Sequence, residues 1–253
     1  MSTAEIVGAV DIEEIADSMR RTGFGQVENA MPADELRSLQ AFARDAVRRK
    51  GDESAYLAPD ALAGTALGEL ARSPELDTFL RQLHEAAAQR PPAPEEHIYA
   101  GLRCLYGRTG AASSLQYHFD SYTVTALVPI EIPTSGNRGD FLYYPNLREV
   151  RRSALVNIAE KAACQNGVTR RVLASQAFRK RIPPQRLELV PGNLYVFWGY
   201  RTLHGNDICD PDQLRATALF HFGDPHLGDP LVQRVHRRVE RAGRTKQLIS
   251  PGV

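Results

Sequence analysis

Apolar residues at helical spacing dominate the first third of the chain. In residues 11–23 they recur every three or four positions, and the stretch ends on a glycine. A short apolar run at 24–27 precedes a second such stretch at 32–50, where Pro32 suits a first helical turn and acidic residues follow it. A third stretch, 73–90, ends at a proline cluster. We therefore predict three helices, with one short strand between the first two.

Beyond residue 96 the pattern becomes that of strands. Runs rich in Val, Ile, Leu, Tyr and Phe are separated by turn signals built on Gly, Pro, Asn and Ser. The predicted strands are residues 97–106, 114–132, 140–144, 187–198 and 215–222. Helices followed by strands with short connections predict an α+β domain with a mainly β core, built around an antiparallel barrel or sandwich.

Composition narrows the function classes. The net charge of +1 provides no global attraction to nucleic acid or to an acidic membrane. Three scattered cysteines are too few for a disulfide scaffold or a closed thiolate zinc site. No apolar run reaches the roughly 20 residues of a membrane span, and the acidic start does not resemble a signal peptide. We expect a soluble cytoplasmic protein without nucleic-acid or membrane partners; its oligomeric state stays open.

The length of 253 residues suits a single domain. We expect residues 1–95 to form helical support and residues 96–225 the β core. A helical insertion at 147–181 carries nine basic residues against two acidic ones, and residues 226–253 form a basic tail.

The segment around His118 and Asp120 carries the chemistry. In a strand, side chains two residues apart project to the same side, so this imidazole and carboxylate would point together. His204, far downstream and followed by glycine, supplies a second imidazole. Two histidines and one carboxylate form the three-ligand set of non-haem Fe(II) oxygenases, which leaves coordination positions open.

A predicted carboxylate receptor follows His204 along the chain. Arg215 and Thr217 share one face of the strand at 215–222, and a guanidinium beside a hydroxyl binds a carboxylate well. A surface arginine at a strand end is the alternative for Arg215. The mostly apolar residues that follow it favour a buried strand instead.

Taken together, the segments at 23–36, 116–120 and 191–217 resemble the Fe(II)/2-oxoglutarate-dependent oxygenases, and within them the phytanoyl-CoA-dioxygenase-like branch. The resemblance implies a double-stranded β-helix, a cupin-like jelly roll, flanked by N-terminal helices. The long basic insertion departs from it, since many relatives have only a short loop there.

The resemblance also implies roles for particular residues. Fe(II) would be held by His118, Asp120 and His204, while Arg215 and Thr217 would pair with the distal carboxylate of 2-oxoglutarate. The enzyme would use O2 and decarboxylate 2-oxoglutarate to succinate and CO2, by default hydroxylating an unactivated C–H bond. Desaturation, cyclisation and demethylation use the same site. Halogenating members have a small residue where Asp120 stands, so halogenation does not fit.

Three other residues are weaker candidates for this pocket, and a fourth residue, Cys104, is not a candidate. Arg103 would reach the 2-oxo acid or a substrate carboxylate, or else lie in water at a strand edge. Tyr122 continues the face of His118 and would contact substrate, with ordinary core packing as its alternative. Trp198 would shape the pocket wall. Cys104 is interpreted as a small buried hydrophobe.

The insertion is predicted to be a mobile lid over the metal, with Arg170 and Arg171 contacting an anionic substrate group. The substrate would then be an anionic small molecule, free or tethered to an acidic carrier; a solvated helix face is the alternative. A natural-product or amino-acid-like compound suits a biosynthetic enzyme of this size. The competing functions are a non-oxygenase cupin-type metal enzyme and a nucleic-acid-binding protein, the latter disfavoured by the lack of stacking aromatics in the basic segments.

Overall fold

The computed structural model describes residues 1–150 and 166–225. The three predicted helices are confirmed as α2 (Ile12–Thr22), α3 (Ala33–Arg49) and α5 (Pro74–Ala88). Their ends follow local chemistry. The Asp11 carboxylate accepts hydrogen bonds from the first backbone N–H groups of α2, and Gly23 ends that helix at a φ of 91°. Ser73 caps α5 in the same way.

Several short elements lie outside the predicted set. They are α1 (Thr3–Gly8), β2 (Ala55–Leu57), the 3₁₀ helix η1 (Pro59–Leu62), α4 (Ala66–Leu70) and α6 (Gly107–Ala112). Each has at most six residues, too few to display an apolar repeat.

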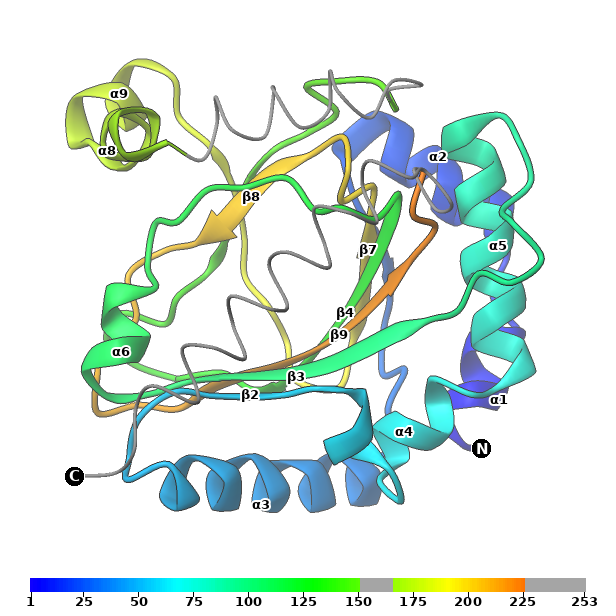
Figure 1. Ribbon diagram of the computed structural model, residues 1–253, viewed down its shortest axis with the longest axis horizontal. Helices are drawn as coiled ribbons and strands as arrows, with labels where there is room; N and C mark the ends of the chain where they lie inside the picture. Colours follow the sequence, from blue (N-terminus) through cyan, green and yellow to red (C-terminus); the bar gives the residue numbers. More distant parts are fainter. Residues whose placement is uncertain (151–165, 226–253) are drawn as a thin grey trace, which may run out of the picture.

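Most of the strands form one antiparallel sheet of six, which crosses the centre of the molecule (Figure 1). In addition to β2 it contains β1 (Gly25–Val27), β3 (Tyr99–Leu105), β4 (Val124–Glu131), β7 (Leu194–Phe197) and β9 (Arg215–Phe222). Their order is β1-β7-β4-β9-β3-β2. The crossovers place β9, from the end of the described chain, between β4 and β3.

A second antiparallel sheet faces the first. It contains β5 (Phe141–Tyr144), β6 (Gln185–Leu187) and β8 (Leu203–Asn206) in the order β6-β5-β8. The predicted jelly roll flanked by helices is therefore confirmed, as two open sheets packed face to face rather than a closed barrel.

Two predicted strands are shorter than expected. Within residues 114–132, only Val124–Glu131 forms a strand. The part that contains His118 is a loop with one isolated β-bridge. Residues 187–198 are broken before β7, where Gly192 adopts a φ of 85°.

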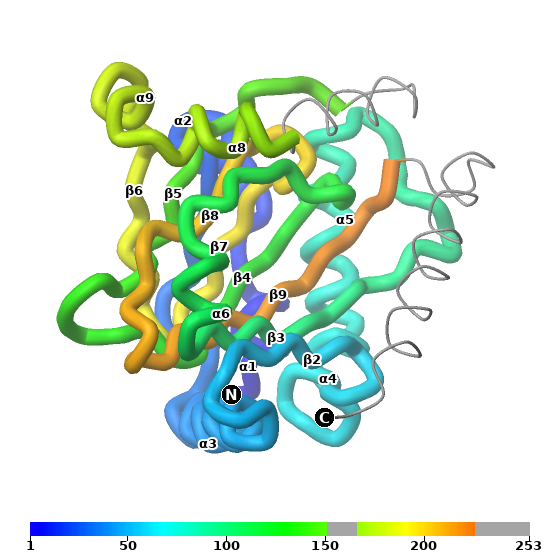
Figure 2. Tube along the Cα trace, turned by 60° about the vertical axis from the view of Figure 1, so that its left-hand side comes forward, coloured from blue at the N-terminus to red at the C-terminus, as the bar shows by residue number. Residues whose placement is uncertain are grey.

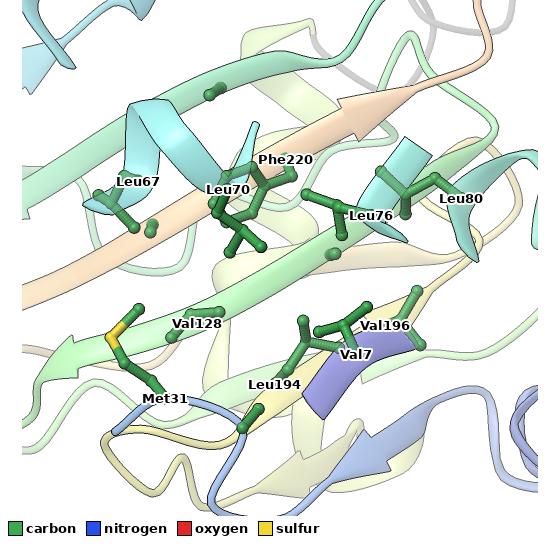
Figure 3. Close-up of a cluster of buried hydrophobic side chains, with 14 of the residues drawn as sticks. Val7, Met31, Leu67, Leu70, Leu76, Leu80, Val128, Leu194, Val196 and Phe220 are labelled. Carbon is green, nitrogen blue, oxygen red and sulfur yellow. The ribbon is translucent and has the colours of Figure 1, made fainter. Parts of the chain in front are cut away.

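The main hydrophobic core fills the space between the helices and one face of the six-stranded sheet. Figure 3 shows Val128, Leu194, Val196 and Phe220 of the sheet meeting side chains of α1, α4 and α5. All four are fully buried. The residues that alternate with them point to the opposite face, toward the smaller sheet. Helix packing on one face thus leaves the other free to hold polar side chains.

The described part of the insertion contains α8 (Gly167–Ala174) and α9 (Gln176–Arg181). Both lie at the end of the molecule opposite α3 (Figure 2). Leu173 and Phe178 pack with Leu142, Tyr144 and Leu203. These three strand residues alternate with those that face the large sheet, so α8 and α9 cover the outer face of the smaller sheet. Residues 166–181 therefore pack on the smaller sheet and do not lie over the predicted metal ligands, while the mobile lid stays a prediction.

Residues 151–165 of the predicted lid and the predicted basic tail at 226–253 lie outside the described residues. Within the described ranges, no helix has the length and apolar character needed to cross a membrane.

Candidate metal centre and adjoining pocket

The three predicted ligands meet between the two sheets, although not by the predicted route. His118 lies in the loop before β4 and pairs with His204 of β8 through an isolated antiparallel bridge, with backbone N–H···O distances of 2.9 and 3.0 Å. The Asp120 N–H donates to the Gly199 carbonyl at 3.0 Å. A regular strand over His118 and Asp120 is therefore wrong, and backbone pairing with a distant segment sets their common direction.

Their potential ligand atoms converge on one point. Asp120 Oδ1 lies 3.7 Å from His118 Nε2 and 3.6 Å from His204 Nε2, and all three ligand atoms lie within 4.8 Å of one another. Bonds of about 2.1 Å to a shared metal bring neighbouring ligand atoms to roughly 3 Å, so small inward shifts complete the site. Within residues 1–150 and 166–225 this is the one group of His, Cys, Asp and Glu side chains with such geometry.

Hydrogen bonds aim both imidazoles at that point. The ring Nδ1 of His118 lies 3.0 Å from the Gln116 carbonyl oxygen, and that of His204 lies 3.0 Å from the Thr202 carbonyl oxygen. A carbonyl oxygen only accepts, so Nδ1 carries the proton and Nε2 presents its lone pair to the centre. Burial lowers the pKa of His204 to about 4, which keeps that lone pair available at neutral pH.

The two carboxylate oxygens of Asp120 have different partners. Its Oδ2 accepts a 2.6 Å hydrogen bond from the Thr125 hydroxyl of β4, which leaves Oδ1 facing the histidines. Burial alone would raise the pKa of Asp120, but the nearby imidazoles and the Thr125 hydrogen bond hold that pKa well below its usual range. The donor set is thus two imidazole nitrogens and one carboxylate oxygen, which fits Fe(II).

Gly199 makes room for this arrangement. A Cβ atom there would overlap Asp120 Oδ2 and lie 2.5 Å from Thr125 Oγ1. We expect Gly199→Ala to push the carboxylate out of line and to weaken Co(II) binding by about tenfold, as measured by calorimetric titration. Gly167→Ala is the matched control, since a Cβ there meets no atom within 4 Å. Equal affinities for the two variants would contradict a spatial role for Gly199.

A cavity of about 260 Å³ extends from the ligand trio between the sheets. The residues that line it come from both sheets and the loop before β4, namely Tyr56, Arg103, His118, Asp120, Thr125, Leu127, Phe141, Phe197, His204, Gly205, Asn206, Arg215, Thr217, Leu219 and His221. One end therefore holds the ligand trio, and arginines are part of the same lining.

Two arginines give this cavity a strongly cationic part. Arg215 is 2% exposed, and its Nε–H donates to the Gly139 carbonyl at 2.7 Å. In the described part of the chain neither Arg215 nor Arg103 forms a salt bridge, and no protein acceptor meets the terminal nitrogens of Arg215. Burial and the nearby Arg103 lower the pKa of Arg215 to about 10, so it remains charged at neutral pH. A buried cation and a half-buried one without ion-pair partners favour binding of an anion.

The register of the strands sets the order of the residues along the floor of the cavity. Thr125, next to Asp120, pairs with His221 across β4 and β9. Four residues along β9, Thr217 pairs with Arg103 of β3. Leu219 lies between these two levels, and the Cα atoms of His221 and Thr217 are roughly 13 Å apart at the usual strand rise. An apolar floor thus separates the ligand trio from the cationic part.

The structure brings only some of the weaker candidates to the cavity. Arg103 lines it, whereas Tyr122 lies just outside the lining and stacks on the His221 ring at 5.2 Å. Trp198 is 1% exposed in the helix-side core, where its indole N–H donates to the Leu83 carbonyl at 3.3 Å, and it does not line the cavity. Arg170 and Arg171 are exposed on α8, also away from the lining. Cys104 is fully buried, as predicted.

Sequence reasoning missed Tyr56, Thr125, Gly199 and His221. His221 had a usable signal, because it continues the face of Arg215 and Thr217 at every second residue of β9. Tyr56 and Gly199 reach the site through contacts between segments that are distant in the sequence, whereas Thr125 is only five residues from Asp120 and its contact depends on the bend between the loop and β4.

No protein-family model matches the chain, and no curated protein matches its sequence. Solved structures do match. The epimerase SnoN in complex with Fe³⁺, α-ketoglutarate and nogalamycin RO aligns with a TM-score of 0.54 at 16% identity, covering 84% of this chain and 83% of SnoN. A prolyl 4-hydroxylase from Pseudomonas putida aligns with a TM-score of 0.52 at 12% identity, covering 84% and 98%.

A member of the 2OG-Fe(II) oxygenase family from Burkholderia pseudomallei aligns with a TM-score of 0.50 at 12% identity, covering 85% of this chain and 91% of that protein. At sequence identities this low, the similarity shows a shared fold and not a shared function. The chain therefore shares the jelly-roll fold of the 2-oxoglutarate-dependent oxygenases.

Proposed function

We propose that the chain is an Fe(II)- and 2-oxoglutarate-dependent dioxygenase that oxidises a small molecule. The observation that carries the proposal is one cavity that joins a His-Asp-His trio to the buried Arg215 and the half-buried Arg103, neither of which forms a salt bridge within the described residues. A metal chelator with a distal carboxylate fits both parts at once. The fold shared with oxygenases of this kind supports the same assignment.

In this proposal His118, Asp120 and His204 hold Fe(II). When bound, the metal supplies open coordination positions and the redox chemistry that activates O2. The protein holds the donor atoms in place through the Gln116 and Thr202 carbonyl oxygens. Rigid placement of the donors limits the reorganisation needed when ligands bind.

The arginines bind the co-substrate. Arg215 offers a guanidinium fork to the distal carboxylate of 2-oxoglutarate, with Thr217 and Arg103 beside it. The methylene groups of the co-substrate would adjoin the apolar side chain of Leu219, and Phe141 and Phe197, which line the same cavity, would limit the access of water to the metal side. The chain and charge of 2-oxoglutarate thus match the order of residues along the cavity.

Hydroxylation of an unactivated C–H bond is the proposed reaction, with conversion of 2-oxoglutarate to succinate and CO2. Desaturation, cyclisation and demethylation remain alternative outcomes of the same site. We propose that the substrate is a small natural-product or amino-acid-like molecule. We also propose that the chain is cytoplasmic and that it belongs to the phytanoyl-CoA-dioxygenase-like branch. The carboxylate of Asp120 in the ligand trio disfavours halogenation.

The decisive test is turnover of 2-oxoglutarate by the purified protein with Fe(II) and O2. We expect succinate formation that requires both, and we expect Zn(II) to suppress it by occupying the same ligands. A non-oxygenase metal enzyme of this fold would leave 2-oxoglutarate intact. Activity with Zn(II) or Mn(II) but without O2 would likewise contradict the proposal.

A further inference from the structure

Three aromatic rings cluster beside the metal centre, between the cavity and the surface. His221 lines the cavity, and its ring lies 5.2 Å from that of Tyr122 with the planes 20° apart. The Tyr122 ring lies 6.2 Å from that of Tyr99 with the planes 15° apart. Tyr99 is 37% exposed. The Tyr99 ring also lies 6.4 Å from that of His221 with the planes 33° apart, so the three rings form one compact cluster that borders both the cavity and solvent.

The hydrogen-bonding state of His221 follows from its neighbours. Asp120, as an ionised carboxylate, accepts the Thr125 hydroxyl proton at 2.6 Å. The Thr125 oxygen, having used its only proton, can only accept from His221 Nδ1, which lies 3.0 Å away. His221 Nδ1 therefore carries a proton and donates it, and in the neutral imidazole Nε2 is left with a lone pair.

That lone pair faces open space. Among the described residues, none forms a hydrogen bond with His221 Nε2. His221 lines the cavity, and its Nε2 atom is not among the fully buried nitrogens that lack a hydrogen-bond partner. His221 thus offers a fixed acceptor at the metal end, beside the two tyrosine rings.

We propose that His221, Tyr122 and Tyr99 form the subsite for the primary substrate, and that this substrate carries a planar ring with a hydroxyl or amino hydrogen-bond donor. The assignment to a primary substrate rests on the proposed oxygenase function, but the binding test below does not depend on that function. Near-parallel aromatic rings favour a further flat ring in offset stacking. An acceptor with a fixed lone pair selects a donor, because a substrate without one would leave that lone pair unpaired on burial.

The test uses metal-free protein and a probe pair that differs only in the donor. 2-Naphthol has the ring and the hydroxyl, whereas 2-methoxynaphthalene keeps the ring without the donor; cyclohexanol has the donor without the flat ring. Ligand-observed NMR titration measures the three affinities. We expect 2-naphthol to bind about tenfold more tightly than either of the others. Equal binding of 2-naphthol and its methyl ether would overturn the proposal.

Variants separate the two elements of the subsite. His221→Phe keeps a ring and removes the acceptor, so it should abolish the preference for 2-naphthol and leave 2-methoxynaphthalene binding in place. Tyr122→Leu should weaken both naphthalenes by about tenfold, and Tyr122→Phe should restore them. His97→Phe is the control for His221→Phe, since His97 is exposed and outside the cavity lining. Retained preference in His221→Phe would refute the role of His221.

The same samples distinguish this proposal from the proposed function. Co(II) and 2-oxoglutarate affinities are measured in parallel on unmodified protein. Normal binding of both, with no discrimination among the three probes, rejects the subsite and keeps the oxygenase. Failure of Co(II) and 2-oxoglutarate binding, with discrimination intact, rejects the oxygenase and keeps a ring-binding site.

Discussion

Replacing His118 by alanine is expected to abolish succinate formation from 2-oxoglutarate. Loss of one of three ligands removes several kcal/mol of metal binding and transition-state stabilisation, a fall in turnover of about 1000-fold or more. His118 is the ligand whose replacement disturbs the fold least, since its side chain is 35% exposed. Co(II) titration and the thermal unfolding midpoint, measured on the same protein, separate loss of metal from loss of structure.

His204→Ala should remove the same activity at a greater structural cost. The His204 side chain is 8% exposed, and its ring lies 4.8 Å from that of Phe197 and 5.5 Å from that of Phe141. Truncation there leaves a cavity in the core, so a lower melting temperature should accompany the loss of metal. Near-normal turnover in His118→Ala would contradict the assignment of the metal centre.

Replacing Arg215 by lysine should raise the apparent KM for 2-oxoglutarate by about 100-fold, roughly 2.7 kcal/mol. The positive charge is kept, but an ammonium group cannot reproduce the planar fork of a guanidinium or donate in the same way to the Gly139 carbonyl. Co(II) affinity should be little changed, since Arg215 is not a member of the ligand trio. Steady-state kinetics with varied 2-oxoglutarate provides the measurement.

Arg44→Lys is the matched control for this variant. Arg44 forms its ion pair with Glu131 on the protein surface, with its side chain 59% exposed, and exposed pairs of this kind contribute little. The KM of this control should equal that of the unmodified protein. An unchanged KM in Arg215→Lys would show that the co-substrate carboxylate binds elsewhere.

The sequence by itself determined the elements with strong local signals. Apolar periodicity and capping residues located the three long helices, because each is specified within one or two turns of chain. Strand alternation likewise placed Arg215 and Thr217 on one face of β9. The residue types of the ligand trio were also available from the sequence, since two imidazoles and a carboxylate form a metal-binding donor set once the fold brings them together.

Only the tertiary structure decided how these parts meet. His118 and Asp120 converge through backbone pairing with β8 and Gly199, and not through a shared strand. Thr125 and His221 complete the site because β4 and β9 are neighbours in the large sheet. Trp198 lies in the helix-side core, and the described part of the insertion covers the outer face of the smaller sheet. The same physical reason applies to each of these cases. The face of a strand or helix that contacts a given neighbour depends on non-local pairing and burial, whereas a pattern along the chain records only local preference.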